Sequence, residues 1–131
     1  MPNIFVNGTF DILHSGHIEM LNYAKSLGTF LLVAIDTDER VKKLKGQDRP
    51  INNQADRAFM LQNLKSVDAV WYFDSEQDLE RIIKLYQPDV MVKGSDYRDK
   101  RIVGAEYCKE IKFYEHTGHS TTGLIQRIVD R

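Results

Sequence analysis

Short apolar runs alternate along the chain with segments in which apolar residues recur at helical spacing. Runs of this length predict β-strands, here at residues 4–7, 30–35, 69–73, 90–92 and 111–114. The run at 30–35 is almost uninterrupted, which is typical of a strand covered on both faces of a sheet. The run at 111–114 is predicted to form an edge strand.

Helical spacing marks four segments between or after these runs, at residues 18–27, 58–64, 79–86 and 122–129. Gly28 follows the first helix and is expected to close it, and Pro88 cannot continue the third. Strands that alternate with helices form parallel sheets joined by right-handed crossovers. The pattern therefore predicts one α/β domain over residues 1–131, a doubly wound (Rossmann-like) fold with a five-stranded, mostly parallel sheet.

Composition excludes some classes of function. The chain has 131 residues, of which 42% are hydrophobic and 28% charged, an ordinary balance for one globular domain with its own core. Its formal net charge of −1 argues against general electrostatic binding to nucleic acid or to an anionic membrane. Any phosphate binding must therefore come from a few cationic groups that are placed locally.

Cys108 is the only cysteine, so no internal disulfide can form, and the chain fits a reducing compartment. The thiol is expected to pack as a small apolar group rather than to act as a nucleophile. No apolar run has the length of a membrane span, and the first residues lack the charged and apolar regions of a signal peptide. We therefore expect a cytoplasmic protein.

The strongest chemical signal lies in residues 8–17, GTFDILHSGH, between the first strand and the first helix. Doubly wound sheets bind ligands at this edge, and a helix N-terminus offers unpaired N–H groups to an anion. Gly8 and Gly16 allow the backbone to approach a ligand closely. His14 and His17, three positions apart, present their rings on one side of the turn, which suits stabilisation of charge on a phosphate under attack.

Two other interpretations apply to this histidine pair. Each histidine could be a polar residue that only satisfies the start of a helix. Paired histidines also have the spacing of metal ligands, but no cysteine or third histidine lies nearby to complete a closed zinc site.

Residues 8–17 resemble the HxGH signature of the nucleotidyltransferase superfamily, in its cytidylyltransferase-like branch. Three later segments resemble the same family in the same order: KKLKGQDRP at 42–50, VKGSDY at 92–97 and STTGLI at 120–125. Within the family, the chain is most similar to the adenylyltransferase domain of the bifunctional ADP-heptose synthase. It is next most similar to glycerol-3-phosphate cytidylyltransferase.

The resemblance implies a role for each of these segments. His14 and His17 are expected to contact the triphosphate and stabilise the transition state, and Lys45, in a basic loop, to reach the phosphates, with Lys42 as the alternative. The residues expected to bind the nucleotide are Gly8, Thr9, Phe10, Asp11, Gly16, Lys93, Gly94, Asp96, Ser120, Thr121 and Thr122. The residues expected near the phosphate of the second substrate are Lys42, Arg49 and Arg57.

Plainer interpretations exist for several of these residues. Lysines often form a solvated face, glycine and aspartate often form a turn after a strand, and hydroxyls often cap a helix. For the hydroxyls at 120–122 we favour phosphate binding, because a helix start attracts anions.

The resemblance also implies the reaction. A phosphate oxygen of the second substrate attacks the nucleotide α-phosphorus in line, and pyrophosphate leaves, so catalysis consists of positioning and charge neutralisation. We expect Mg²⁺ to accompany the triphosphate, held mainly by phosphate oxygens and water. We expect ATP as donor and a sugar phosphate such as D-glycero-D-manno-heptose 1-phosphate as acceptor.

The resemblance leaves the substrates, the activity and the assembly open. CTP and glycerol 3-phosphate form a second possible substrate pair, and flavin-forming adenylyltransferases share the histidine signature. A nucleotide-binding regulatory module without catalysis is a different class, although both histidines and Lys45 are present. Relatives lead us to expect a homodimer.

Overall fold

The computed structural model describes residues 2–115 and 121–129. Five parallel strands form one sheet in the order β3-β2-β1-β4-β5. The strands are β1 Asn3–Gly8, β2 Phe30–Asp36, β3 Ala69–Phe73, β4 Val90–Gly94 and β5 Glu110–Tyr114. The predicted α/β class and the edge position of the last strand are confirmed, and every strand pair, not only most of them, is parallel.

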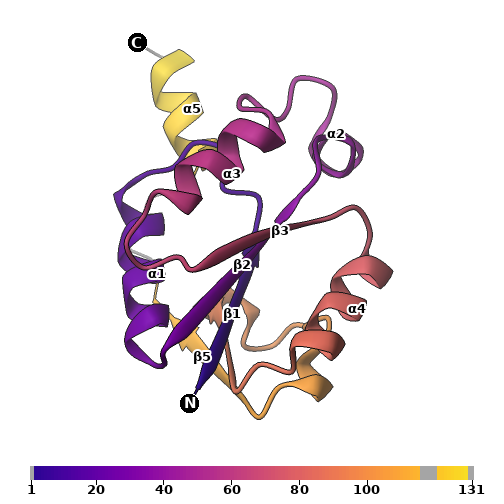
Figure 1. Ribbon diagram of the computed structural model, residues 1–131. Coiled ribbons are helices and arrows are strands. Elements are labelled where there is room, and N and C mark those ends of the chain that lie inside the picture. Colours follow the sequence, from indigo (N-terminus) through magenta and orange to yellow (C-terminus); the bar gives the residue numbers. More distant parts are fainter. Residues whose placement is uncertain (1, 116–120, 130–131) are drawn as a thin grey trace.

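Helices cover both faces of the sheet (Figure 1). The helices are α1 Ser15–Ser26, α2 Asp38–Lys45, α3 Gln54–Gln62, α4 Glu76–Tyr86 and α5 Thr121–Val129, with 3₁₀ turns η1 Ser95–Tyr97 and η2 Ala105–Tyr107. One core cluster joins α1 and α3 to the sheet, and a second joins α4 to its opposite face. None of the helices in the described chain combines the length and apolar character that crossing a membrane requires.

Helix α2 corrects one expectation, because the basic segment was predicted to be a loop and is helical up to Lys45. Thr37 caps this helix, its side chain accepting the backbone N–H of Arg40, and acidic residues fill the first turn while lysines fill the last. Only Val41 is buried in α2. The helix therefore has start and end signals in the sequence but almost no apolar period, which is why the hydrophobic pattern missed it.

Gly28 follows α1 where a helix end was predicted, but for a different reason. The cap residue Leu27 keeps a right-handed helical conformation, so no left-handed glycine ends this helix. A Cβ at Gly28 would lie 2.5 Å from the carbonyl oxygen of Pro2. Glycine is needed there because the start of β1 passes directly over the chain.

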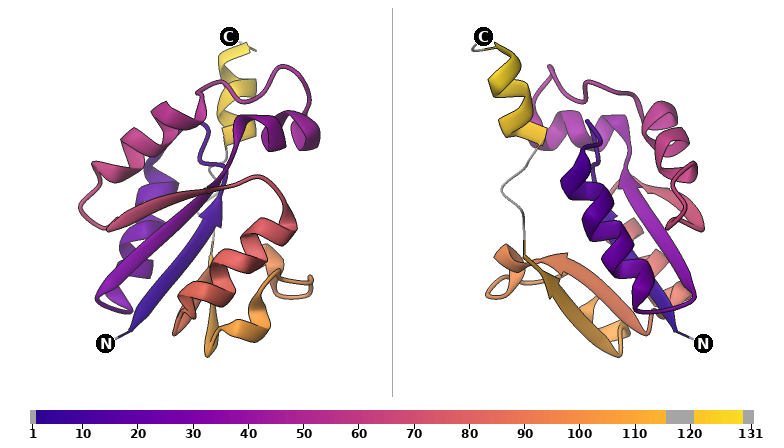
Figure 2. Two further views of the ribbon diagram at one scale, coloured as in Figure 1. Left: turned by 45° about the vertical axis from the view of Figure 1, so that its right-hand side comes forward. Right: turned by 90° about the vertical axis from the view of Figure 1, so that its left-hand side faces the viewer.

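The order of the strands creates a switch point between β1 and β4. The chain builds outward from β1 through β2 to β3, and then crosses back to place β4 on the other side of β1 (Figure 2). β1 pairs with β2 at six positions but with β4 at only two, Ile4–Val90 and Phe5–Met91. The loops that leave β1 and β4 diverge at the carboxyl edge, which is where doubly wound sheets bind ligands.

Candidate active site

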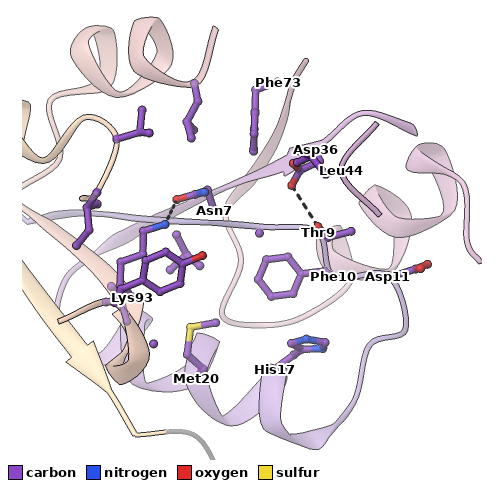
Figure 3. A pocket seen from close by; sticks show the side chains of 18 of the residues that line it. Asn7, Thr9, Phe10, Asp11, His17, Met20, Asp36, Leu44, Phe73 and Lys93 are labelled. Carbon is purple, nitrogen blue, oxygen red and sulfur yellow. Dashed lines mark hydrogen bonds between the residues drawn. The ribbon is translucent and has the colours of Figure 1, made fainter. Parts of the chain in front are cut away.

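A cavity of about 580 Å³ opens at this carboxyl edge. Its walls come from the signature segment (residues 8–17), the end of β2 with α2, the end of β3 with the start of α4, and the end of β4 with the loop that follows. Figure 3 shows that His17 and Lys93 enter the cavity from different sides, with Phe10 between them. The cavity therefore lies over the switch point, as the sequence predicted for the signature segment.

The two histidines stack at the amino end of α1. Their ring centroids lie 3.8 Å apart, with 21° between the ring planes. The Nδ1 atom of His14 accepts the backbone N–H of Gly16 at 3.1 Å, and Nδ1 of His17 accepts the backbone N–H of His14 at 3.2 Å. The two rings form a capping box, an arrangement in which Ser or Thr and Glu or Gln are the usual partners.

These hydrogen bonds decide which ring nitrogen carries the proton. A nitrogen that accepts a hydrogen bond presents its lone pair, so a neutral ring of this kind has its proton on Nε2. Both His14 and His17 line the cavity. The pair therefore places two Nε2–H groups, of which that of His14 is buried, at the N-terminus of a helix, where the backbone dipole also favours an anion.

The signature segment folds around Phe10, which has a backbone φ of 51°. Phe10 is 6% exposed, and its ring meets the ring of His17 edge-on, with 5.0 Å between centroids. A Cβ at Gly8 would lie 3.0 Å from the Phe10 ring. A side chain at position 8 would therefore press on the ring of Phe10, which in turn supports the catalytic candidate His17.

A second polar group at the cavity comes from the end of β2. Asp36 is 7% exposed, accepts a hydrogen bond from Thr9 Oγ1 at 3.3 Å, and forms an ion pair with Nε of Arg40 at 3.0 Å. The Arg40 guanidinium lies 5.5 Å from the centroid of the Phe73 ring. Sequence reasoning missed Asp36 and Arg40. The available signal was position, because Asp36 ends the strand next to β1 and so reaches the same edge of the sheet.

Lys93, near the end of β4, is half-buried at the side of the cavity away from the histidines. Its Nζ donates to Asn7 Oδ1 at 2.9 Å and lies 4.7 Å from the centroid of the Tyr97 ring. Burial lowers the pKa of Lys93 to about 8, although the carboxylates of Asp36 and Asp96 act in the opposite direction. A cation that has lost its hydration in this way gains more free energy from binding a phosphate than an exposed lysine does.

Comparison with known proteins identifies the family. A model of the cytidylyltransferase-like family matches residues 5–124. The chain belongs to the cytidylyltransferase-like family. This membership confirms the predicted resemblance and the predicted nucleotidyltransferase class of enzyme.

The cytidylyltransferase-like chain also has close relatives. It is 49% identical over 126 residues to the bifunctional protein HldE of Aliarcobacter butzleri, and 48% identical over 128 residues to that of Campylobacter concisus. These alignments cover 95% and 97% of this chain, but 26% and 27% of the relatives. The chain therefore spans about a quarter of the length of these relatives.

Solved structures show the same fold. The lipopolysaccharide core biosynthesis protein from Thermoplasma volcanium superposes with a TM-score of 0.70 at 25% identity, over 92% of this chain and 99% of that one. Pantothenate synthetase from Thermus thermophilus superposes with a TM-score of 0.59 at 17% identity, over 88% of this chain and 56% of that one. The second likeness concerns the fold alone.

The structure brings together most of the residues that the family resemblance assigned to the nucleotide. Among the described residues, the cavity is lined by Gly8, Thr9, Phe10, Asp11, His14, Gly16, His17, Lys45, Lys93 and Gly94. Lys42 is exposed on α2 and lies outside this lining set, so the geometry favours Lys45 as the lysine of the basic segment. Asp96 is exposed in η1 and also lies outside it.

Arg57 differs most from its expected place near the second substrate. It is 1% exposed, and its guanidinium donates to three backbone carbonyls and to the Asp38 carboxylate. Arg49 points into the protein as well, where its Nε donates to Asp11 at 3.0 Å. Neither arginine is among the described residues that line the cavity, and both have structural partners. Binding of the second substrate is therefore not proposed for them.

The C-terminal motif is described only in part. Ser120 lies outside the described residues. Helix α5 begins at Thr121, within one residue of the predicted start, and the side chains of Thr121 and Thr122 also lie outside what is described. Both views in Figure 2 place α5 at the end of the molecule toward which the strands point. The phosphate-binding role of residues 120–122 stays a prediction.

Metal and assembly predictions also stay open. Within residues 2–115 and 121–129, no three His, Cys, Asp or Glu side chains lie together in a way that could hold a metal ion. The Asp36 carboxylate already bonds Thr9 and Arg40. This donor set fits a cation that arrives with the phosphates better than one bound by the protein. The homodimer stays a prediction.

Proposed function

We propose that this chain transfers a nucleotidyl group from a nucleoside triphosphate, preferably ATP, to a sugar phosphate such as D-glycero-D-manno-heptose 1-phosphate, with release of pyrophosphate. The observation that carries the proposal is the pair of Nε2–H donors at the amino end of α1, inside a cavity that also holds Lys45 and Lys93. The heptose acceptor rests on the resemblance to the adenylyltransferase domain of the bifunctional ADP-heptose synthase. Relatives named bifunctional protein HldE and lipopolysaccharide core biosynthesis protein support it.

The histidine pair supplies the electrostatic part of the mechanism. As the acceptor phosphate attacks the α-phosphorus, negative charge grows on the non-bridging oxygens and on the leaving pyrophosphate. The Nε2–H groups of His14 and His17 would donate to these oxygens. Because capping hydrogen bonds hold both rings and the ring of Phe10 packs against His17, the two donors need little reorganisation as the charge develops.

The cationic groups supply attraction at the other walls of the cavity. Lys45, at the end of α2, would neutralise the triphosphate on the side of the second strand, and Lys93 would bind phosphate or ribose oxygens beyond Phe10. Arg40 also lines the cavity but is already paired with Asp36. Mg²⁺, when bound to the triphosphate, would add charge neutralisation of the same kind, chiefly through phosphate oxygens.

The experiment that tests this function is pyrophosphate release in the presence of Mg²⁺. ATP and CTP are each crossed with heptose 1-phosphate, glycerol 3-phosphate and a small panel of other sugar phosphates. We expect turnover with ATP and the heptose phosphate, and mass spectrometry should detect the nucleotide-linked sugar. Turnover only with CTP and glycerol 3-phosphate would refute the proposed substrates but keep the reaction class. Nucleotide binding without turnover on any acceptor would refute the enzyme activity.

A matched pair of variants links the activity to the site. His17→Ala removes one of the two Nε2–H donors, whereas Lys65→Ala removes an exposed charge that lies outside the cavity. Turnover should fall in the first variant and stay unchanged in the second. Equal activity of both variants would show that the measured turnover does not come from this cavity.

A further inference from the structure

The Asp11 carboxylate forms hydrogen bonds with the chain about 40 residues further on, and it does not point to the centre of the cavity. It is 1% exposed, and Figure 3 shows its carboxylate pointing away from Phe10 and Lys93. Its Oδ2 accepts the N–H of Ile51 at 2.9 Å and Nε of Arg49 at 3.0 Å, and its Oδ1 accepts the N–H of Asn52 at 2.8 Å. A carboxylate with these three donors is engaged in holding protein.

The same contact continues through the backbone of Asp11. The side-chain amide of Asn52 donates to the Asp11 carbonyl at 2.7 Å, so Asp11 and Asn52 bind each other in both directions. We call residues 49–57 the bracing segment, because it also contains Arg57. The Arg57 guanidinium donates to the carbonyls of Thr9 and Asn52, each at 3.0 Å.

The bonds from the bracing segment lie on the two sides of Phe10. Thr9 is held by Arg57, and Asp11 is held by Asn52, Ile51 and Arg49. Phe10 between them has a φ of 51°, a conformation that a side chain other than glycine adopts only when its neighbours enforce it. The bracing segment therefore imposes the turn from which the histidine pair starts.

The bracing segment also fixes both ends of α2. At the first turn, Asp38 bonds Nη2 of Arg57 at 2.8 Å, and its backbone N–H donates to Gln54 Oε1 at 2.8 Å. At the last turn, the backbone N–H of Arg49 donates to the Gly46 carbonyl at 3.2 Å, one residue after Lys45. The ion pair between Arg49 and Asp11 therefore joins the turn after Lys45 to the signature segment.

We propose that Asp11 is a positioning residue, which through Arg49 and the bracing segment sets the distance between Lys45 and the histidine pair. The inference rests on the proposed function for its kinetic consequences. Lys45 is exposed and is the last residue of α2, so its position depends on where this helix ends. Misplacing a reacting group by about 1 Å lowers a rate by on the order of 100-fold.

A double-mutant cycle tests this coupling. Asp11→Asn keeps the volume but turns an NH₂ group toward at least one of the N–H donors that the carboxylate accepts. We expect Asp11→Asn and Lys45→Ala each to lower kcat by about 10-fold to 100-fold. The double variant should be no more than about threefold slower than the slower single variant, because both changes remove the same contribution. Effects that multiply would refute the positioning role.

Two further variants separate positioning from simple loss of stability. Arg49→Lys keeps the charge and one donor, and it should restore most of the kcat lost in Arg49→Ala. Asp68→Asn is the matched control, because Asp68 also accepts a backbone N–H, that of Leu31 at 2.7 Å, and pairs with a lysine, but at the opposite edge of the sheet. The Asp68→Asn variant should lose stability and keep the kcat of the wild type. If Asp68→Asn lowers kcat as much as Asp11→Asn does, the loss of kcat comes from lost stability and not from misplacement of Lys45.

Hydrogen exchange provides a readout that does not depend on the reaction. Peptides covering residues 8–14 and 43–48 should exchange at least about tenfold faster in Asp11→Asn than in the wild type, and not in Asp68→Asn. If the wild type turns over no acceptor, the proposed function fails, but hydrogen exchange still tests whether Asp11 holds the bracing segment against the signature segment. Unchanged exchange in both peptides would refute this positioning role of Asp11, whatever the activity. If Asp11→Asn does not fold, Asn52→Ala, which removes the bond to the Asp11 carbonyl, takes its place in the same measurements.

Discussion

Replacing Lys93 by methionine should stabilise the fold while it weakens phosphate binding. Burial lowers the pKa of Lys93 from its ordinary 10.5 to about 8, against the opposing effect of Asp36 and Asp96. A difference of this size means that folding disfavours the charged ammonium by about 3 kcal/mol. Methionine is of similar length and loses the hydrogen bond to Asn7, worth about 1 kcal/mol. We therefore expect Lys93→Met to be about 2 kcal/mol more stable than the wild type at neutral pH.

The stability difference should depend on pH in one direction. Because the folded-state pKa of Lys93 lies below the unfolded-state value, the unfolded chain binds more protons between about pH 8 and about pH 10.5. The stability of the wild type relative to the variant therefore rises with pH in this window. The advantage of Lys93→Met is complete below about pH 8 and is lost toward about pH 10.5.

Urea unfolding at about pH 7 and about pH 10 measures both effects, with the fluorescence of Trp71, the only tryptophan, as the signal. Lys65→Met, which removes an exposed lysine outside the cavity, is the control and should show neither effect. If Lys93→Met were no more stable than the wild type at about pH 7, or if the difference were equal at both pH values, burial would not disfavour the charged ammonium of Lys93. Calorimetric titration with ATP should show at least about tenfold weaker binding, since one pKa unit of interaction corresponds to that factor. Unchanged affinity would remove Lys93 from the phosphate site.

Three other predictions follow from single contacts. His17→Ala should lower kcat by about 10²-fold to 10³-fold in the pyrophosphate assay, because it removes one donor from the developing charge, and near-normal turnover would show that His17 is only a cap. Burial alone would raise the pKa of Asp11, but its backbone donors and Arg49 outweigh this and lower the pKa below 3.8. Asp11→Asn should therefore be less stable than the wild type by its full amount above about pH 4, and the difference should become smaller as the pH falls further. Unfolding measured over a series of acidic pH values tests this, and a stability difference independent of pH would contradict it. Gly104→Ala should lower the free energy of unfolding by about 1–3 kcal/mol, because φ is 79° and the added Cβ would lie 2.6 Å from Ile83 Cδ1; urea unfolding that matches the wild type would show that the turn relaxes freely.

The strands and most helices were predictable because their apolar residues follow the period of each element. Residues 30–35 form an apolar run, of which residues 31–35 become the buried part of β2. The histidine pair was predictable because glycines, a preceding strand and a following helix all surround it. Such features are local in the sequence, so no knowledge of the partner segments is needed to interpret them.

The places where prediction failed depend on contacts between distant segments. A buried arginine is rare, and nothing near Arg57 in the sequence shows that three carbonyl oxygens converge on its guanidinium. The local pattern likewise cannot show that Asp11 is bonded to residues 51 and 52. Asp36 could have been found, since the strand order follows from the crossovers and brings its strand next to β1.

The unequal pairing of β1 has a mechanical consequence for the cavity above it. Six residue pairs join β1 to β2, but only two join β1 to β4, so the strand pairing is weakest at the switch point between β1 and β4. His17 lies on the β1 side of this boundary and Lys93 on the β4 side, and the hydrogen bond between Lys93 and Asn7 crosses it. A triphosphate that contacts both sides would hold them together, because separating β1 from β4 would then break ligand contacts as well as backbone pairs. The empty protein should therefore open along this line more readily than the loaded one, and ligand binding should stiffen the middle of the sheet as well as the loops.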